Sequence, residues 1–169
     1  MPASDDDRFE DFYDAAFGRL VGQLYLVIGD LAEAEDVVQE AFTRAAMRWQ
    51  KLRVYDAPEI WVRRVAINLA NDGFRQARRR LALLARLGRR EPEVVEPPAF
   101  EHAAVAEALR ALPRHQREVV VLHHLLDLPV AEVAAQLRIP AGTVKSRLKR
   151  ARDTLARVLE PEGVVSWRS

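Results

Sequence analysis

The chain has 169 residues, of which 49% are hydrophobic and 30% charged, and it contains no cysteine. This length suits one domain or two small ones, and a chain without cysteine forms neither a disulfide nor a thiolate metal site. The opening residues MPASDDD lack the layout of a signal peptide, and no apolar run approaches the ~18 residues of a membrane span. We therefore expect a soluble, cytoplasmic protein with no direct membrane insertion.

A net charge of +1 conceals an alternation of sign along the chain. Residues 1–43 hold eleven acids and two bases, whereas residues 44–90 hold three acids and thirteen bases. Residues 91–137 return to eight acids and three bases, and residues 138–169 hold three acids and eight bases. This alternation predicts two separate cationic surfaces, each with an acidic neighbour.

Two amphipathic helices are expected in the first part of the chain. From Phe9 to Ile28 the apolar residues recur every three to four positions, and Gly29-Asp30 ends that pattern. A second helix is expected from about Leu31 to Trp49. Its polar face is normally only solvated, but it is also a candidate for docking a basic or polar partner; its residues are Glu33, Asp36, Gln39, Glu40, Thr43 and Arg44.

A third helix is expected over about residues 58–75, after a short loop at residues 51–57. Asp56 and Glu59 have the spacing of a capping box, and the proline at the first helical position suits a helix start. Residues 81–87 can extend this helix.

One face of this third helix carries side chains suited to nucleic acid. Arg64, Asn68, Asn71 and Arg75 lie at i, i+4, i+7 and i+11, and the arginines at 78–80 extend the basic surface. Asn and Arg can contact base edges and phosphates together. A merely hydrophilic helix back is the alternative, and the alignment with the arginines favours nucleic acid.

A proline-rich stretch divides the chain. Residues 88–99 contain three prolines and three glutamates, which predicts an extended linker. Helices are expected again over residues 103–112 and 116–126, the second of which should bury Val119, Val120, Leu122 and Leu126. No stretch shows convincing strand alternation, so the fold class expected is all-α.

The segment 130–155 has the pattern of a helix-turn-helix. Pro140 cannot continue the first helix, and Thr143 or its neighbours can start the second. The inward positions expected are Val133, Ala134, Leu137, Val144, Leu148, Ala151 and Leu155. This leaves a cationic outer face formed by Lys145, Ser146, Arg147, Lys149, Arg150 and Arg152. Because a helix fits the major groove and Arg and Lys neutralise phosphates, DNA contact is favoured over a solvated basic helix.

Catalytic and metal-binding patterns are missing from the sequence. His123 and His124 are adjacent and point about 100° apart on a helix, with no accompanying ligand pattern. There is no nucleophile elbow, Walker loop or dinucleotide fingerprint. We expect no enzyme activity, no metal and no cofactor.

Four blocks, spread over nearly the whole chain, resemble bacterial RNA polymerase sigma factors of the extracytoplasmic-function type. The resemblance is closest to the short actinobacterial sigma-E-like subfamily. The blocks are DVVQEAFTRA (36–45), WVRRVAINLANDGFR (61–75), ALRALPRHQREVVVLHHLLDL (108–128) and IPAGTVKSRLKRARDTL (139–155).

This resemblance implies two small helical domains joined by a flexible linker, the C-terminal one carrying the helix-turn-helix. Residues 1–87 would be a region 2-like domain that binds core polymerase and the −10 element, and residues 101–160 a region 4-like domain that binds the −35 element. Residues 88–100 would be the linker and 161–169 a tail. The implied function is promoter recognition, promoter melting and transcription initiation. The implied partners are core RNA polymerase, promoter DNA and an anti-sigma factor.

Matching the family motifs residue by residue implies three sets of contacts. The core-polymerase set is Asp36, Val37, Gln39, Glu40 and Phe42. The −10 set, which includes a loop that pockets a flipped base, is Lys51, Arg53, Tyr55, Trp61, Arg64, Asn68, Asn71, Arg75, Arg78 and Arg79. The −35 set is Thr143, Lys145, Ser146, Arg147, Lys149 and Arg150, with Thr143 and Arg147 expected on phosphates.

Three residues depart from the family pattern. Arg138 stands where the turn often has glycine, so a left-handed conformation there would cost about 1 kcal/mol. Pro129 replaces the usual serine cap, and Lys149 leaves the −35 sequence open. In addition, the linker glutamates 91, 93 and 96 are hypothesised to thread a basic channel of the polymerase.

Two alternatives to a promoter-specificity subunit remain on the residues alone. One is a stand-alone helix-turn-helix regulator that uses residues 100–160 on duplex DNA and residues 1–85 to sense or dimerise. The other is an all-helical interaction module without a DNA role. The Asn/Arg face in the first domain argues against the stand-alone regulator, because a sensor domain has no reason to display it.

Overall fold

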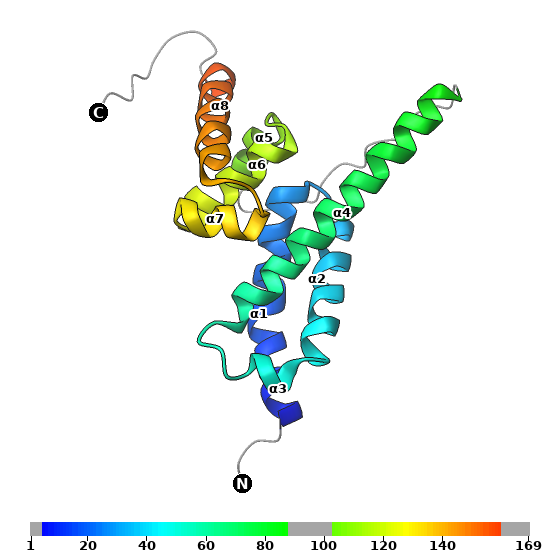
Figure 1. Cartoon of the computed structure of the whole chain (residues 1–169), viewed down its shortest axis with the longest axis vertical. Helices are drawn as coiled ribbons and strands as arrows, with labels where there is room; N and C mark the ends of the chain where they lie inside the picture. Colours follow the sequence, from blue (N-terminus) through cyan, green and yellow to red (C-terminus); the bar gives the residue numbers. More distant parts are fainter. Residues whose placement is uncertain (1–4, 88–102, 160–169) are drawn as a thin grey trace. The chain divides into compact units, whose positions relative to one another are not determined.

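The computed structural model describes residues 5–87 and 103–159, and every regular element in these ranges is a helix (Figure 1). The all-α expectation is therefore confirmed. The chain divides into two compact units, Met1–Pro98 and Ala99–Ser169. The expected linker at 88–100, with its three glutamates, and the tail at 161–169 lie outside the described residues.

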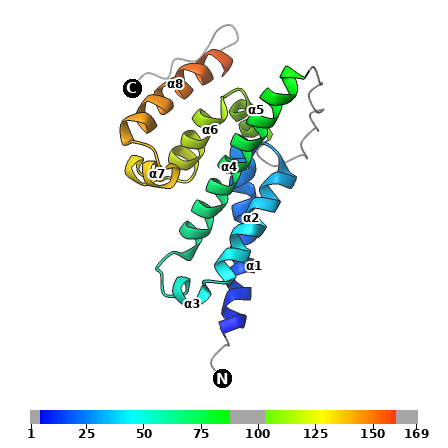
Figure 2. The same ribbon diagram turned by 45° about the vertical axis from the view of Figure 1, so that its right-hand side comes forward.

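The first unit is a helical bundle of α1 (Asp5–Ile28), α2 (Leu31–Ala46), α3 (Trp49–Leu52) and α4 (Pro58–Arg86). α2 packs against both α1 and α4, and α4 runs back along the other two helices (Figures 1 and 2). The α1–α2 connection turns at Gly29, whose φ of 84° favours glycine. Asp30 then caps α2, because its side chain accepts a hydrogen bond from the Glu33 N–H at 2.8 Å.

An aromatic cluster fills the end of this bundle nearest to α3. Phe42 is 1% exposed and contacts four rings of α1. Tyr13 lies edge-on to it, with ring centroids 4.9 Å apart. The Phe42 ring therefore packs against α1 on the apolar side of α2, and its expected role in polymerase binding stays a prediction.

Trp49 joins the same cluster and changes the expected boundaries. Its ring stacks on Phe12 with centroids 5.3 Å apart, and Trp49 and Leu52 are both buried. α2 therefore ends at Ala46, and a separate short helix, α3, carries Trp49 into the core. Lys51, which was expected in a loop, lies in α3.

The capping box expected before α4 is not formed. Ala57 is the N-cap residue and no side chain caps it. Glu59 instead pairs with Arg19 of α1: the Arg19 Nε donates to Glu59 Oε1 at 3.0 Å, and a second nitrogen of the guanidinium donates to the other oxygen. A two-pronged pair between helices holds the carboxylate more strongly than the single backbone N–H of a capping box.

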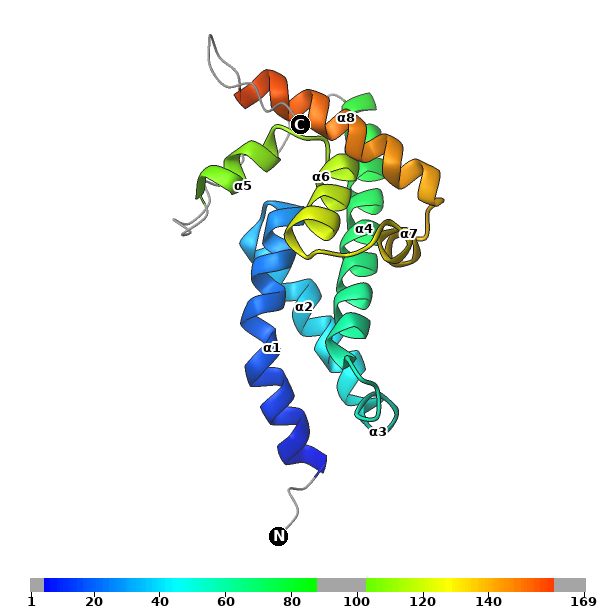
Figure 3. The ribbon, with the colours of Figure 1, turned by 90° about the vertical axis from the view of Figure 1, so that its left-hand side faces the viewer.

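The second unit contains α5 (Ala103–Arg110), α6 (Arg114–Val120), the π-helical turn η1 (Val121–Leu125), α7 (Val130–Leu137) and α8 (Ala141–Leu159) (Figure 3). α6 and α7 pack against α8. The expected helix at 116–126 thus begins two residues earlier, and its last turn is π. This wider turn shifts the buried face, so that Val121 is buried and Leu126 is only half-buried.

The turn between α7 and α8 adopts the left-handed conformation expected for Arg138. Its φ and ψ are 55° and 45°, and the Ile139 N–H donates to the Ala134 carbonyl at 3.1 Å. α8 begins at Ala141, two residues before Thr143, because the Pro140 carbonyl already accepts from the Thr143 N–H at 2.9 Å. α7 follows Pro129, which provides no side-chain cap.

None of the described helices combines the length and the apolar character that crossing a membrane requires.

Replacing Phe42 by alanine should destabilise the first unit by about 3–5 kcal/mol, because it removes the central ring of the aromatic cluster. Glu40→Ala, two residues away on the exposed face, is the control and should change stability by less than about 0.5 kcal/mol. Urea denaturation followed by tryptophan fluorescence measures both. A fully stable Phe42→Ala variant would contradict this assignment.

Replacing Arg138 by glycine should stabilise the second unit by about 1 kcal/mol, because glycine adopts a positive φ without strain. Arg152→Gly, in the exposed interior of α8, should destabilise it by about the same amount. Hydrogen exchange of the α7 and α8 amides reports both changes. Equal loss of protection in the two variants would argue against strain at Arg138.

Candidate nucleic-acid interface

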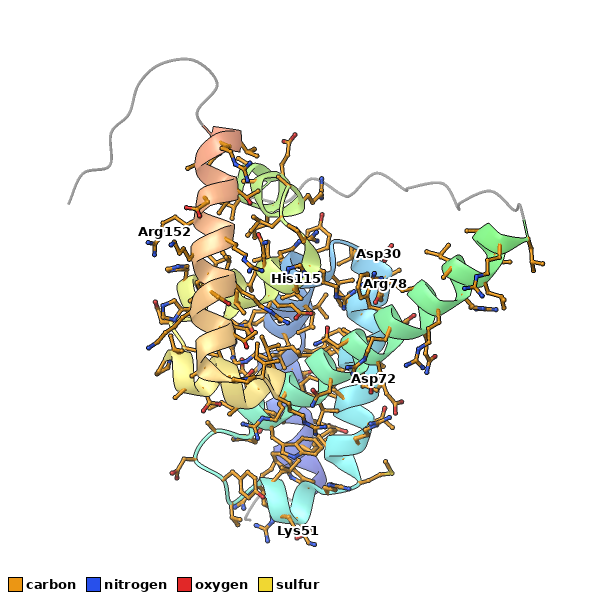
Figure 4. All side chains as sticks on the ribbon, turned by 45° about the horizontal axis from the view of Figure 1, so that its top comes forward. Asp30, Lys51, Asp72, Arg78, His115 and Arg152 are labelled. Atoms are coloured by element: carbon orange, nitrogen blue, oxygen red, sulfur yellow. The ribbon has the colours of Figure 1, made fainter. Side chains whose placement is uncertain are left out.

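The outer face of α8 is cationic, as the sequence predicts. Val144, Leu148 and Ala151 are buried, which turns the opposite side of the helix outward. Lys145, Ser146, Lys149 and Arg150 are exposed, as is Arg152, which Figure 4 shows beside α8. Thr143 and Arg147 are half-buried. The structure thus places the whole expected −35 set on one helix, at the turn end of α8.

Arg147 lies close to a buried carboxylate of α6. Glu118 is 5% exposed, and the Arg114 Nε donates to its Oε1 at 3.4 Å. Burial raises the pKa of Glu118, and the charges of Arg114, Arg147 and Arg117 oppose that rise. The buried Glu118 side chain thus lies near cations of both α6 and α8.

His115 is a further side chain at this surface that the sequence analysis missed. It is exposed on the first turn of α6 (Figure 4). Burial lowers its pKa, and so do the nearby charges of Arg147 and Arg150. His115 therefore lies beside the α8 cations. Because α6 and α8 are far apart in sequence, no local spacing could have shown this neighbourhood.

The polar face expected on the third helix is present on α4. Asn68, Asn71 and Arg64 are half-buried, and Arg75 is exposed with its guanidinium 2.5 Å from the Asp72 carboxylate. Arg78 and Arg79 extend the same helix as exposed cations. The arrangement presents amides near the bundle and arginines farther along α4.

The residues expected at the −10 loop lie around α3 and the start of α4. Lys51, Arg53 and Tyr55 are exposed, and Figure 4 shows Lys51 at the α3 end of the unit. Trp61 is half-buried, with the Arg48 guanidinium 5.9 Å from its ring centroid.

A surface hollow of about 390 Å³ lies at the α2–α3 turn, next to this loop. It is lined by Met47, Arg48, Gln50 and Lys51. It shares Lys51 with the loop residues expected to pocket a base.

The acidic surface expected for polymerase binding is formed by α2. Asp36, Gln39 and Glu40 are exposed and Val37 is half-buried. Arg44 donates to Glu40 at 2.8 Å, and the Tyr13 hydroxyl donates to the Gln39 side chain at 2.9 Å. With Phe42 turned into the core, this surface is polar and negatively charged.

The described residues include no group of three metal-ligating side chains arranged around a common point. The His123 Nδ1 lies 2.7 Å from the Leu128 carbonyl oxygen, a contact that ties η1 to the segment before α7.

Glu118 should make the stability of the second unit depend on pH. Because its pKa is raised in the folded state, its contribution to stability is fully present below the unfolded pKa and is lost as the pH rises through the folded pKa. We expect the free energy of unfolding to fall relative to Glu118→Gln as the pH rises from the ordinary glutamate pKa of about 4 through the raised pKa of Glu118. Hydrogen exchange of α6 and α8 measures this, with the exposed Glu107→Gln as control. Parallel pH profiles for wild type and Glu118→Gln would contradict the prediction.

Comparisons with known proteins match both units. The family Sigma-70 region 2 matches residues 12–80, and Sigma-70, region 4 matches residues 102–155. The ECF RNA polymerase sigma factor SigW of Bacillus subtilis is 30% identical, over 92% of this chain and 90% of that protein. The RNA polymerase sigma-E factor of Streptomyces coelicolor is 29% identical, over 92% of this chain and 93% of that protein.

Two solved structures are also similar. One is the sigma factor RpoE in complex with the anti-sigma factor NepR from Bartonella quintana. The match covers 92% of this chain and 99% of the RpoE chain, with a TM-score of 0.69 and 22% sequence identity, which shows a shared fold. The other is CnrH in complex with the cytosolic domain of CnrY. This match covers 92% of this chain and 89% of the CnrH chain, with a TM-score of 0.58 and 29% sequence identity. With both conserved regions matched in order and a relative aligned over nearly its whole length, this chain belongs to the extracytoplasmic-function (ECF) RNA polymerase sigma factors, which direct promoter recognition and transcription initiation.

Proposed function

We propose that the two units divide the work of promoter recognition. Residues 1–87 bind core polymerase and the −10 element, residues 101–160 bind the −35 element, residues 88–100 link them and 161–169 form a tail. The observation that supports this division is that each unit turns a cationic helix face outward, on α4 and on α8. Among the described residues, the first unit also has an acidic face, on α2. In this proposal α2 binds core polymerase, α4 binds the −10 element and α8 binds the −35 element.

In this proposal α8 enters the major groove of the −35 element. Lys145, Ser146, Lys149 and Arg150 are exposed near its start and face the bases. Thr143 and Arg147 contact phosphates, which agrees with their half-buried positions. His115 adds a donor beside Arg147 and Arg150. Because most of these groups are cations, binding should weaken steeply as salt is raised.

At the −10 element, the loop and α4 hold a melted strand. The exposed Tyr55 ring can stack on a base, and the Lys51 and Arg53 cations follow the backbone. Asn68 and Asn71 face bases, beside Trp61 and Arg64. Extruding a base costs a few kcal/mol, which stacking and phosphate contacts can offset. Arg75, Arg78 and Arg79 extend these contacts along α4.

For core polymerase, we propose the α2 surface of Asp36, Val37, Gln39 and Glu40. Phe42 belongs to the same proposed set and supports this surface from beneath. The negative charge of the surface implies a basic or amide-rich partner site. Sigma factors are regulatory subunits, and the proposal assigns this chain no catalytic step. It places the protein in the cytoplasm, where the polymerase acts.

A second protein is proposed to control this sigma factor. CnrH, 29% identical to this chain, is held in a complex with the cytosolic domain of CnrY. The similar RpoE structure holds the anti-sigma factor NepR. Because this chain is similar to CnrH, we propose that an anti-sigma factor also binds this chain and keeps it from binding polymerase.

Run-off transcription with purified core polymerase tests the division of labour. Lys149→Ala with Arg150→Ala should reduce transcription from a promoter that needs its −35 element by about tenfold or more, because each base contact is worth about 1–3 kcal/mol. The same variant should bind core polymerase normally. Asp36→Ala with Glu40→Ala should show the reverse pattern.

Matched single variants serve as controls. Arg157→Ala removes an exposed cation near the far end of α8, and Glu35→Ala removes an exposed acid of α2 outside the proposed surface. Both should behave like wild type. If the two double variants lost core binding equally, the division of labour would be wrong. If wild type with core polymerase gave no promoter-dependent transcript, the proposed function itself would fail.

A further inference from the structure

Gln39, in the middle of the acidic surface of α2, is tied to α1 by a hydrogen bond. The Tyr13 hydroxyl donates to the Gln39 Oε1 at 2.9 Å, from a position 26 residues earlier in the chain. Gln39 is exposed, as are Asp36, almost one helical turn before it, and Glu40, directly after it. A side chain of the neighbouring helix therefore holds a residue that is proposed to bind core polymerase.

The Tyr13 ring is itself held by two other rings. It lies edge-on to the buried Phe42 ring, with centroids 4.9 Å apart, and it stacks on the Phe17 ring with centroids at the same distance. Aromatic pairs of these two geometries are favourable beyond their burial alone. α1 and α2 also pack against each other as whole helices (Figures 1 and 2). The Tyr13 hydroxyl is therefore a donor at a fixed place beside the α2 surface.

The direction of this hydrogen bond decides what Gln39 can offer to a partner. A glutamine amide has an oxygen that accepts hydrogen bonds and an NH2 group that donates two. The Tyr13 hydroxyl takes a lone pair of the oxygen, so the oxygen is held toward α1. This fixes the orientation of the amide and leaves the two N–H donors for another molecule.

An NH2 donor makes Gln39 different from the charged residues around it. The carboxylates of Asp36 and Glu40 can only accept, and Glu40 already accepts from the Arg44 Nε at 2.8 Å. A partner site made only of cations would match the carboxylates but would oppose the Gln39 NH2 group with further donors. The surface therefore fits a partner site in which a carbonyl or carboxylate oxygen lies beside basic groups.

The stability of the fold gives this hydrogen bond little importance. Gln39 is exposed and Tyr13 is only half-buried, so water can replace either partner at small cost. Binding gives the bond a larger effect, because a free glutamine side chain loses rotamer freedom when it docks. A glutamine that is already held in place loses less.

We propose that Tyr13 is a positioning residue for polymerase binding. Its hydroxyl orients the Gln39 amide so that the NH2 group donates to an acceptor oxygen of the core enzyme. This role rests on the proposed function of the α2 surface, whereas the ordering of Gln39 in the free chain does not.

The first measurement concerns the free chain. Tyr13→Phe removes the hydroxyl and keeps the ring, so the contacts with Phe42 and Phe17 are retained. NMR relaxation of the nitrogen-15-labelled full chain reports how well ordered the Gln39 NH2 group is. We expect its order parameter to fall in Tyr13→Phe, while the order parameter of the buried Gln136 NH2 group and the urea midpoint stay unchanged.

The second measurement is a double-mutant cycle, in which fluorescence anisotropy follows binding of the labelled full chain to purified core polymerase. Tyr13→Phe should weaken binding about two- to tenfold, the range of one net hydrogen bond, and Gln39→Ala at least as much. Adding Tyr13→Phe to Gln39→Ala should change the affinity by less than about twofold. Gln39→Glu still accepts from Tyr13 but has no donor, so it should bind more weakly than wild type despite its added negative charge.

Three results would overturn the proposal. One is an equal effect of Tyr13→Phe with and without Gln39→Ala, because Tyr13 would then act independently of Gln39. Another is wild-type affinity of either Tyr13→Phe or Gln39→Glu. The third is an unchanged order parameter of Gln39 in the free Tyr13→Phe chain.

Failure of the proposed function has a different signature. In that case neither Gln39→Ala nor the double variant Asp36→Ala with Glu40→Ala would weaken binding to core polymerase. The role of Tyr13 in polymerase binding would fall with the α2 surface. If Gln39→Ala weakened binding and Tyr13→Phe did not, only the positioning role would be lost.

Discussion

Burial of one side of α8 is the constraint on which the DNA-facing surface depends. Val144, Leu148 and Ala151 are fixed against the rest of the second unit, and this burial decides that Lys145, Lys149 and Arg150 face outward. The like charges of these cations repel one another. Apolar contacts from the other side must therefore outweigh that repulsion, and a small domain has few such contacts to lose.

The packing of α6 against α8 also leaves one carboxyl group, that of Glu118, buried in a small core. Glu118 loses solvation on folding, and its raised pKa is the sign of that cost. The charges of Arg114, Arg147 and Arg117 offset part of that cost, but burial is the larger effect.

Periodicity predicted most of the helices because each buries a continuous apolar side. Periodicity does not show contacts between segments distant in sequence. Phe42 lies on an apolar side of α2, but the four rings around it come from α1. Glu59 has the spacing of a capping box, but Arg19, forty positions away, takes its carboxylate. No local pattern contains the partner in either case.

In the second unit, too, some features could not be predicted from the spacing of apolar residues. Gln136 is fully buried in α7, although a hydrophobic stripe gives no reason to expect an amide there. The π turn at Val121–Leu125 moves the buried face by a fraction of a turn, which 3.6-residue spacing cannot anticipate. His115 joins the α8 cations only because α6 and α8 pack together. By contrast, the sequence located all six residues of the expected −35 set on one helix, because a single amphipathic pattern contains them.

The left-handed turn at Arg138 shows how local strain and surface charge can be balanced. Glycine would adopt this conformation without the strain of about 1 kcal/mol that arginine bears. Arginine, however, adds an exposed cation immediately before the basic helix, where a phosphate backbone would strengthen its contribution. The strain is present whether or not DNA is bound, whereas a phosphate contact by Arg138 would add affinity only on DNA. A residue that lowers stability slightly can therefore still raise affinity, provided that α7 and α8 pack well enough to hold the turn.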